Sequence, residues 1–207
     1  MLTIANKFPI FDLSEIVVET ELSYKTFQPL KPVKTGCVIP DFVLHQDSDL
    51  WQRFSNGGET REPLLWKDLL SKPLVIGFYS SLWRSIGTKQ LNQLNAIQPE
   101  IRANGGNLLV ITAERDKELA KIAWDHNLSL NFYFDDNNGL AKIFNVYSEN
   151  DPAWTKFSGI DNNIPLPATY VINAAKRIVY DHVDIASFGT FSSRQVVSVV
   201  HDAALFQ

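Results

Sequence analysis

Apolar residues along the chain fall into short runs that glycine, proline and polar residues separate. Residues 73–79 ("PLVIGFY") are almost continuously apolar, which is typical of a strand covered on both faces of a sheet. Residues 107–113 ("NLLVITA") and 130–135 ("LNFYFD") have a similar character, and a shorter run lies at 41–45 ("DFVLH"). These four segments predict strands, whereas residues 55–60 ("SNGGET") predict a loop.

Between these runs, apolar residues recur at the spacing that is typical of a helix. Leu91, Leu94, Ile97 and Ile101 recur at intervals of three or four residues, and "NGG" at 104–106 closes that helix. Further helices are predicted at 64–70 ("LLWKDLL"), at 114–127 with acidic residues in its first turn, and at 137–147, capped by the turn that Asp135 and Asp136 begin.

The C-terminal part of the chain predicts a hairpin followed by a helix. Residues 167–183 contain two β-rich runs joined by a tight connection. Behind Ser192 and Ser193 as caps, one helical face carries Val196, Val197, Val200, Ala203 and Ala204. Alternating strands and helices with a closing hairpin predict an α/β fold of the thioredoxin type, a mixed, largely parallel sheet with helices on both faces.

One domain is expected, with an extension before it. A chain of 207 residues suits one domain with a substantial core. The segment "PLKPVK" contains two prolines and two lysines and predicts an extended connector. We therefore assign residues 1–32 to an N-terminal extension and residues 33–207 to the domain.

Composition narrows the classes of function. Hydrophobic residues make up 45% and charged residues 20% of the chain, as in globular proteins. The net charge is −4 and no run of Lys or Arg stands out, which argues against a nucleic-acid partner or an anionic membrane surface. No apolar stretch approaches the roughly 20 residues that span a bilayer, and the opening residues lack the apolar core of a secretory signal. We expect a cytoplasmic protein.

The histidines and the cysteine form no pattern that is typical of a metal site or of a catalytic nucleophile. The spacing of His45, His126, His182 and His201 matches no metal-ligand signature and no serine-based catalytic arrangement, so no metal or cofactor is expected. Cys37 is the only cysteine, which excludes an intramolecular disulfide. Its neighbours would not stabilise a thiolate, so we expect a small buried hydrophobic residue there. We also expect Trp66, Trp124 and Trp154 in or beside the core.

Between about Val33 and Val200 the chain resembles the peroxiredoxin-like branch of the AhpC/TSA (redoxin) family. "GCVIPDFVL" is similar to the family's Gly-Asp-x-x-Pro-Asp-Phe opening, and "PLVIGFYSSLWRSIG" to its strand followed by Phe-Tyr-Arg-Gly-Gly-Trp-Cys-Pro-Tyr-Cys. The later blocks are matched, in order, by "GGNLLVITAE", "NFYFDDNNGLAKIFNVY" and "PLPATYVI" with "RIVYDHVD".

The resemblance places the family's peroxide-reacting cysteine at Arg84 and its partner cysteine at Gly87, with Ser85 where the family has proline. The family's activity as an antioxidant thiol peroxidase or oxidoreductase depends on a thiolate that attacks the peroxide O–O bond and becomes a sulfenic acid. A serine hydroxyl is too weakly acidic for this role. Both sulfurs are missing, so the resemblance implies the scaffold without its chemistry.

The resemblance also identifies candidate binding residues around the former thiol site. These are Tyr79, Ser81, Trp83, Arg84, Pro167 and Thr169. For Arg84 two interpretations stay open: a solvated or stacked side chain that covers the site, or a group that binds an anion together with the helix start. Trp83 is expected to be a structural plug, Tyr79 and Thr169 to pack in the core, and Pro167 to be either cis or an ordinary trans proline.

Two functions follow from these residues. The first is a non-catalytic binding or regulatory protein that holds a protein partner or a small anion at the former site. The second is a thiol peroxidase or thiol-disulfide oxidoreductase that uses Cys37 or a partner's thiol. A homodimer formed through the N-terminal segment also stays open.

Overall fold

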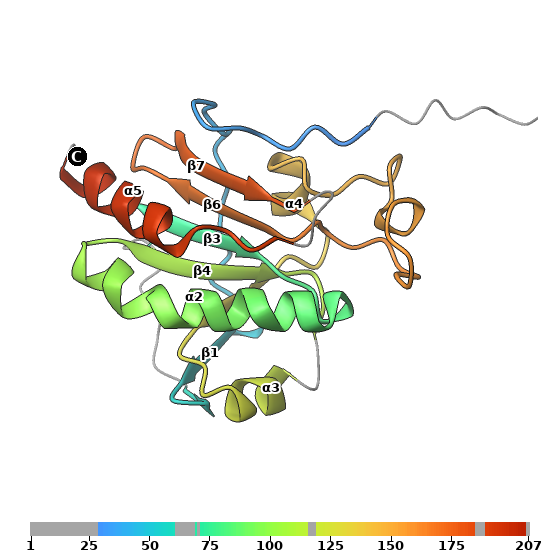
Figure 1. The fold of residues 1–207 in the computed structure, drawn as a ribbon, viewed down its shortest axis with the longest axis horizontal. Coiled ribbons are helices and arrows are strands. Elements are labelled where there is room, and N and C mark those ends of the chain that lie inside the picture. The colour runs from blue at the N-terminus through green and yellow to red at the C-terminus, as the bar shows by residue number, and fades with distance from the viewer. Residues whose placement is uncertain (1–28, 61–68, 70, 116–118, 185–188, 206–207) are drawn as a thin grey trace, which may run out of the picture.

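Seven strands form one sheet in the part of the chain that the computed structural model describes, residues 29–60, 69, 71–115, 119–184 and 189–205. The strand order is β2-β1-β5-β4-β3-β6-β7 (Figure 1). The strands are β1 Trp51–Ser55, β2 Gly58–Glu59, β3 Leu74–Phe78, β4 Asn107–Thr112, β5 Asn131–Phe134, β6 Ala168–Ile172 and β7 Ile178–Val183. The helices are α2 Ser85–Ala103, α3 Leu119–Asp125, α4 Gly139–Ile143 and α5 Ser193–Leu205, with short 3₁₀ helices η2 Ser48–Leu50, η3 Ser81–Trp83 and η4 Ala153–Thr155.

The sheet is mixed, as predicted, but its parallel pairing is confined to the three central strands, and the other pairings are antiparallel. β3 pairs parallel with β4, and β4 parallel with β5, whereas β1 and β6 run antiparallel to their neighbours. Phe78 at the end of β3 lies opposite Ala168 at the start of β6. The carboxyl ends of β3, β4 and β5 therefore meet the start of β6 at one edge of the sheet.

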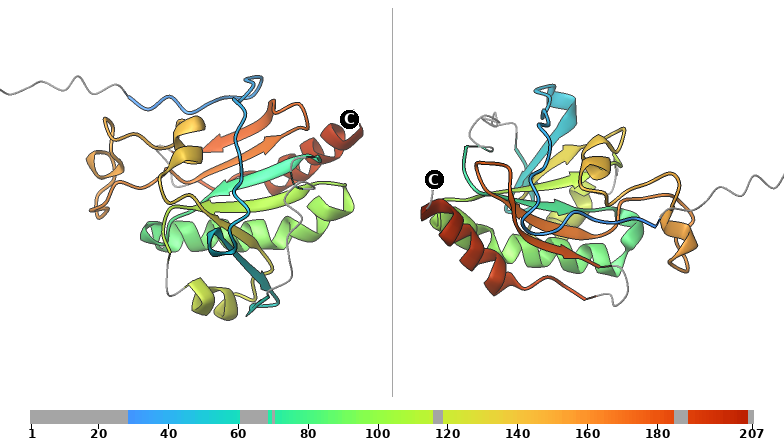
Figure 2. Two further views of the ribbon diagram at one scale, coloured as in Figure 1. Left: turned by 180° about the vertical axis from the view of Figure 1, so that it is seen from behind. Right: turned by 90° about the horizontal axis from the view of Figure 1, so that it is seen from above.

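Helices cover both faces of the sheet, as predicted (Figures 1 and 2). Successive strand residues point to opposite faces, so β3 contributes Val75 to one core and Ile76 to the other. The first core lies under α2, α3 and α5 and includes Leu94. The second lies under α4 and the extended segment 30–44 and includes Phe144. None of the described helices is long and apolar enough to cross a membrane.

The predicted strand at 41–45 is wrong. The segment is extended, and Phe42 and Leu44 are buried while Val43 is 68% exposed, but it does not pair with the sheet. The outermost strands on this side of the sheet are instead β1 and β2. They form a hairpin that turns at Asn56 and Gly57, within the residues expected to form a loop. The helix predicted at 64–70 lies outside the described residues, apart from Leu69. The extension predicted for residues 1–32 is outside them up to residue 28.

Three predictions about burial are wrong. Trp124 is 72% exposed and Trp154 is 49% exposed, so neither belongs to the core, while Trp66 lies outside the described residues. Cys37 is exposed because it follows a turn in which its N–H donates to the Lys34 carbonyl, 3.0 Å away.

The loop after α4 is held by one buried carboxylate. Asp151 accepts a hydrogen bond from the Leu30 N–H at 2.6 Å and another from the Lys156 ammonium. Burial by itself raises the pKa of the Asp151 carboxyl, but these two hydrogen bonds and the charge of Lys156 bring the pKa below its usual value. The pair fixes the loop next to Phe157, whose ring packs on Trp83.

We predict that Asp151→Asn lowers the free energy of unfolding by about 1–3 kcal/mol at neutral pH. Because the folded-state pKa lies below the unfolded value of about 3.9, the contribution is present above that pH and is lost as the pH falls through the folded-state pKa. Urea unfolding at a series of pH values measures the difference. The exposed Lys142–Glu149 pair provides the control, since Glu149→Gln should change stability by less than about 1 kcal/mol. A difference between wild type and Asp151→Asn that does not shrink at low pH would contradict the assignment.

Candidate functional site

The junction between β3 and α2 lies at the sheet edge where β3, β4 and β5 end. The chain leaves β3 through Tyr79, whose N–H donates to the Ile111 carbonyl at 2.9 Å. Ser80 then caps η3, because its Oγ accepts a hydrogen bond from the Leu82 N–H at 3.1 Å. The junction is therefore built on a short, capped 3₁₀ turn.

Trp83 closes the inner side of this junction. Its indole N–H donates to the Pro165 carbonyl at 2.8 Å, and its ring meets Phe157 edge-on at 4.9 Å between centroids. The side chain is 3% exposed. Trp83 is a structural plug, as the sequence predicts, and both of its neighbours belong to the loop that Asp151 anchors.

Glu114 supplies the carboxylate of the junction, and sequence reasoning missed it. It accepts hydrogen bonds from Ser80 Oγ at 2.6 Å, from Ser81 Oγ at 2.9 Å and from the Ser81 N–H at 3.3 Å. The expectation that Glu114 starts a helix is wrong, because neither Glu114 nor Arg115 is helical. Its position directly after β4 indicates that it lies near the junction, because the carboxyl ends of neighbouring parallel strands lie at the same edge of the sheet. Both hydroxyls donate to a carboxylate.

Arg84 occupies a strained position at the start of α2. Its backbone has φ 50° and ψ −124°, a combination that favours glycine and costs on the order of 1–3 kcal/mol in other residues. Its carbonyl accepts from the N–H and the hydroxyl of Thr88, so the backbone is held while the side chain is exposed. Among the described carboxylates, none pairs with the Arg84 guanidinium.

Gly87 is buried where α2 presses on the end of β3. A Cβ at this position would lie 2.9 Å from the Ser80 carbonyl oxygen and 2.9 Å from Cε2 of Tyr79. Real Cβ atoms do not come this close to a backbone oxygen. Gly87 therefore has no room for a side chain unless the junction shifts.

The remaining candidate residues lie below the surface. Thr169 is 1% exposed and its Oγ1 lies 3.4 Å from Gln90 Nε2, which also donates to the Ala168 carbonyl. Pro167 is buried and follows a trans peptide bond, so the cis alternative is wrong. Tyr79 packs in the core. Of the six candidates, Arg84 is exposed and Ser81 is partly exposed, and these two can meet a ligand without a rearrangement.

Cys37 lies at the other end of the sheet. Its carbonyl accepts from the Ile178 N–H at 2.8 Å, and Ile178 pairs with Ile172, which pairs with Leu74 at the start of β3. The junction follows the other end of β3, four residues on, a distance of roughly 13 Å along the strand. The thiol cannot take part in chemistry at Arg84 within one chain.

A comparison with protein families matches the AhpC/TSA family model to residues 35–181. The chain belongs to the AhpC/TSA family. The match includes the junction, β1 to β6 and most of β7, so the family assignment rests on the same residues that build the site. A search of curated proteins finds no match.

Several solved peroxiredoxins share the fold of this AhpC/TSA protein. Peroxidoxin BcpB from Mycobacterium tuberculosis has a TM-score of 0.55 and 17% identity, covering 84% of this chain and 99% of its own. AhpC from Mycobacterium tuberculosis gives 0.57 and 12%, covering 83% and 98%, and the reduced 2-Cys peroxiredoxin of Plasmodium vivax gives 0.54 and 15%, covering 82% and 81%. The predicted thioredoxin-like, peroxiredoxin-type fold is confirmed.

We predict that Gly87→Ala destabilises the protein by about 1–3 kcal/mol through overpacking. The sign is informative, because the same substitution inside an unhindered helix stabilises by about 1 kcal/mol. Denaturant unfolding measures the change. Lys89→Ala, at an exposed position of the same helix, should change stability by no more than about 0.5 kcal/mol. A more stable Gly87→Ala protein would mean that the junction has more room than the structure gives it.

Proposed function

We propose that this AhpC/TSA family member is a non-catalytic binding or regulatory protein whose β3–α2 junction recognises an anionic group, carried by a protein partner or by a small molecule. The observation that carries the proposal is the absence of a thiol from the junction. Arg84 and Gly87 stand where the family's sulfurs are expected, and the chain's only cysteine lies at the opposite end of β3.

The chemistry of the junction supports a loss of peroxidase activity. A peroxidase thiolate attacks one peroxide oxygen, forms an S–O bond and releases the other oxygen as an alcohol or water. A hydroxyl cannot enter the cycle of sulfenic acid and disulfide. Ser80 and Ser81 also donate their hydroxyl hydrogens to Glu114, which is an arrangement that positions a loop rather than one that activates a nucleophile.

The exposed guanidinium of Arg84 supports the anionic ligand. Arginine presents a planar set of donors that matches a carboxylate or a phosphate, and it stays charged at all physiological pH values. Its position at the first turn of α2 adds the positive end of a helix dipole. Three donors of Ser80 and Ser81 already hold the Glu114 carboxylate, so the anionic group of a ligand would meet Arg84 and the first turn of α2 instead.

The competing function is a redox protein that uses Cys37, and the exposure of that thiol is the observation in its favour. Such a protein would form an intermolecular disulfide, because the thiol has no second cysteine within the chain. Cys37 would then work with a partner's thiol at the opposite end of the sheet from Arg84.

We expect hydrogen peroxide to oxidise Cys37 no faster than an ordinary free thiol. Free-thiol titration and intact mass, followed over time at substoichiometric and excess peroxide, give the rate. Cys37→Ser is the control for oxidation of other residues. Rapid, selective oxidation of Cys37 that a thiol reductant reverses would overturn the non-catalytic proposal.

We expect Arg84→Gly to abolish phosphate binding at the junction while raising the free energy of unfolding by about 1 kcal/mol, because glycine relieves the positive-φ strain. A stabilised protein that no longer binds separates the loss of the guanidinium from unfolding. Titration of inorganic phosphate by NMR, alongside urea unfolding, measures both effects. Arg194→Ala is the matched control, since Arg194 is an exposed arginine at the start of α5. Equal phosphate binding in Arg84→Gly and wild type would contradict the role of Arg84.

A further inference from the structure

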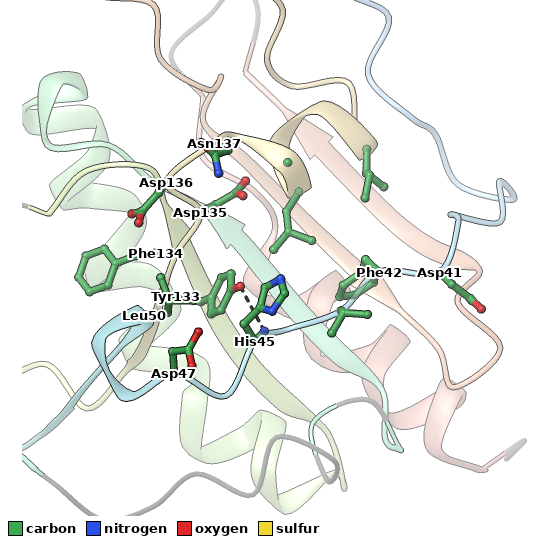
Figure 3. Close-up of a pocket in the computed structure, with 14 residues that line it drawn as sticks. Asp41, Phe42, His45, Asp47, Leu50, Tyr133, Phe134, Asp135, Asp136 and Asn137 are labelled. Carbon is green, nitrogen blue, oxygen red and sulfur yellow. Dashed lines mark hydrogen bonds between the residues drawn. The ribbon is translucent and has the colours of Figure 1, made fainter.

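A cavity of about 610 Å³ lies between residues 41–50, the end of β5 and the start of α4 (Figure 3). It shares the carboxyl edge of the sheet with the β3–α2 junction, but none of its lining residues belongs to that junction. Its volume lies within the range of roughly 300–1,000 Å³ that is usual for small-molecule sites. The side chains that line the cavity determine which kind of ligand it can hold.

The floor of the cavity is apolar and aromatic. Tyr133 is buried at its centre, with the Trp51 ring edge-on at 4.9 Å between centroids and the His45 N–H donating to its hydroxyl at 3.3 Å. Phe42 and Leu140 also line the cavity and are buried. A ligand that fills this space needs an apolar body, and the faces of aromatic rings favour a positive charge.

The rim of the cavity is acidic. Four of the lining residues are aspartates, and none is lysine or arginine. Asp41 pairs with Lys176, and Asp136 pairs with Arg115 at 3.3 Å, so each of these charges has a counter-ion in the structure. Asp47 and Asp135 remain, and Figure 3 shows them on opposite sides of the cavity with Tyr133 between. Among the described cations, none pairs with either of them.

Asp135 is held rigidly at this rim. The residue is 8% exposed, and its Oδ2 accepts from the Ala141 N–H at 3.0 Å, so the carboxylate caps α4 as the sequence predicts. Burial raises the pKa of the Asp135 carboxyl, and the nearby charge of Asp136 raises it further, while the backbone N–H groups of α4 oppose the change. A cation in the cavity would favour the ionised form.

We propose that this cavity binds a small organic cation, a protonated amine attached to an apolar body. The amine would lie at the rim between Asp47 and Asp135, and the apolar body would pack on Tyr133 and Phe42. The negative rim disfavours anions. The described residues contain no group of three or more metal-ligating side chains, so the apolar floor and the carboxylates point to an organic cation rather than a metal ion. The proposal does not depend on Arg84.

The test is a titration with 2-phenylethylamine and with its neutral counterpart 2-phenylethanol, measured by calorimetry and by the NMR signal of the Trp51 indole N–H. That N–H donates to the His45 carbonyl at 2.7 Å, next to the cavity. For a ligand of this size we expect a Kd of about 1 mM for the amine and at least about tenfold weaker binding of the alcohol.

Variants identify the carboxylates. Asp47→Asn and Asp135→Asn should each weaken amine binding about tenfold, which corresponds to about 1.4 kcal/mol. The Asp135→Asn substitution keeps a side-chain oxygen for capping α4, and circular dichroism confirms that the variant is folded. Asp47 is exposed, so Asp47→Asn tests the same point without a risk to the core. Asp125→Asn, at an exposed position of α3 outside the cavity, should bind as wild type.

The proposal would be overturned by binding of 2-phenylethanol as tightly as the amine, by an equal loss in Asp125→Asn and Asp47→Asn, or by saturable binding in neither titration. A binding amine that leaves the Trp51 signal unmoved would place the site elsewhere and would also overturn it.

Discussion

The pairing of β3 between a parallel and an antiparallel neighbour is the constraint on which the rest of the structure depends. The register sets Phe78 opposite Ile111 of β4 and Ala168 of β6. Because β5 runs parallel to β4, its end also arrives at this edge, and the residues after the strands come together there. Ser80, Glu114 and Asp135 are far apart in sequence, yet each leaves the same edge of one sheet.

The absence of sulfur at the junction comes with a particular local arrangement. The hydroxyls and the N–H at the start of η3 already hold a carboxylate, that of Glu114, and α2 packs so tightly at Gly87 that a side chain does not fit. Restoring one cysteine to this site would leave these contacts in place. The junction therefore combines a carboxylate that is already bound with a helix start that leaves no room for a side chain at Gly87.

The sequence predicts the central strands well because a strand that is buried on both faces has apolar residues at nearly every position, as in β3 and β4. It fails where burial is partial. β1 contains Gln52 and Arg53, pairs on one side with a two-residue strand, and carries no such run. Residues 41–45 have the apolar spacing of a strand, and Phe42 and Leu44 are buried as that spacing requires, but β1 takes the place beside β5. The spacing of apolar residues indicates which residues are buried. It does not indicate which segment pairs with the outer strand of a sheet.

The residues of the β3–α2 junction were predictable to different degrees. Trp83 was predictable because it stands in the pattern by which the sequence resembles the family, whereas Glu114 was assigned to a helix and is not helical in the structure. The contacts of Glu114 come from the strand register, which links residues that sequence periodicity does not connect. The cavity near Tyr133 was out of reach for the same reason, since its walls come from three separate segments.

The position of Cys37 gives the molecule a natural handle. It is the chain's single thiol, it is exposed, and it lies at the end of the sheet opposite the Arg84 junction. A maleimide dye would label every molecule at this one position. A linker to a surface would hold every molecule in the same orientation, with the edge where β3, β4 and β5 end directed into solution. The protein can thus be tethered or labelled at one defined point without an engineered cysteine.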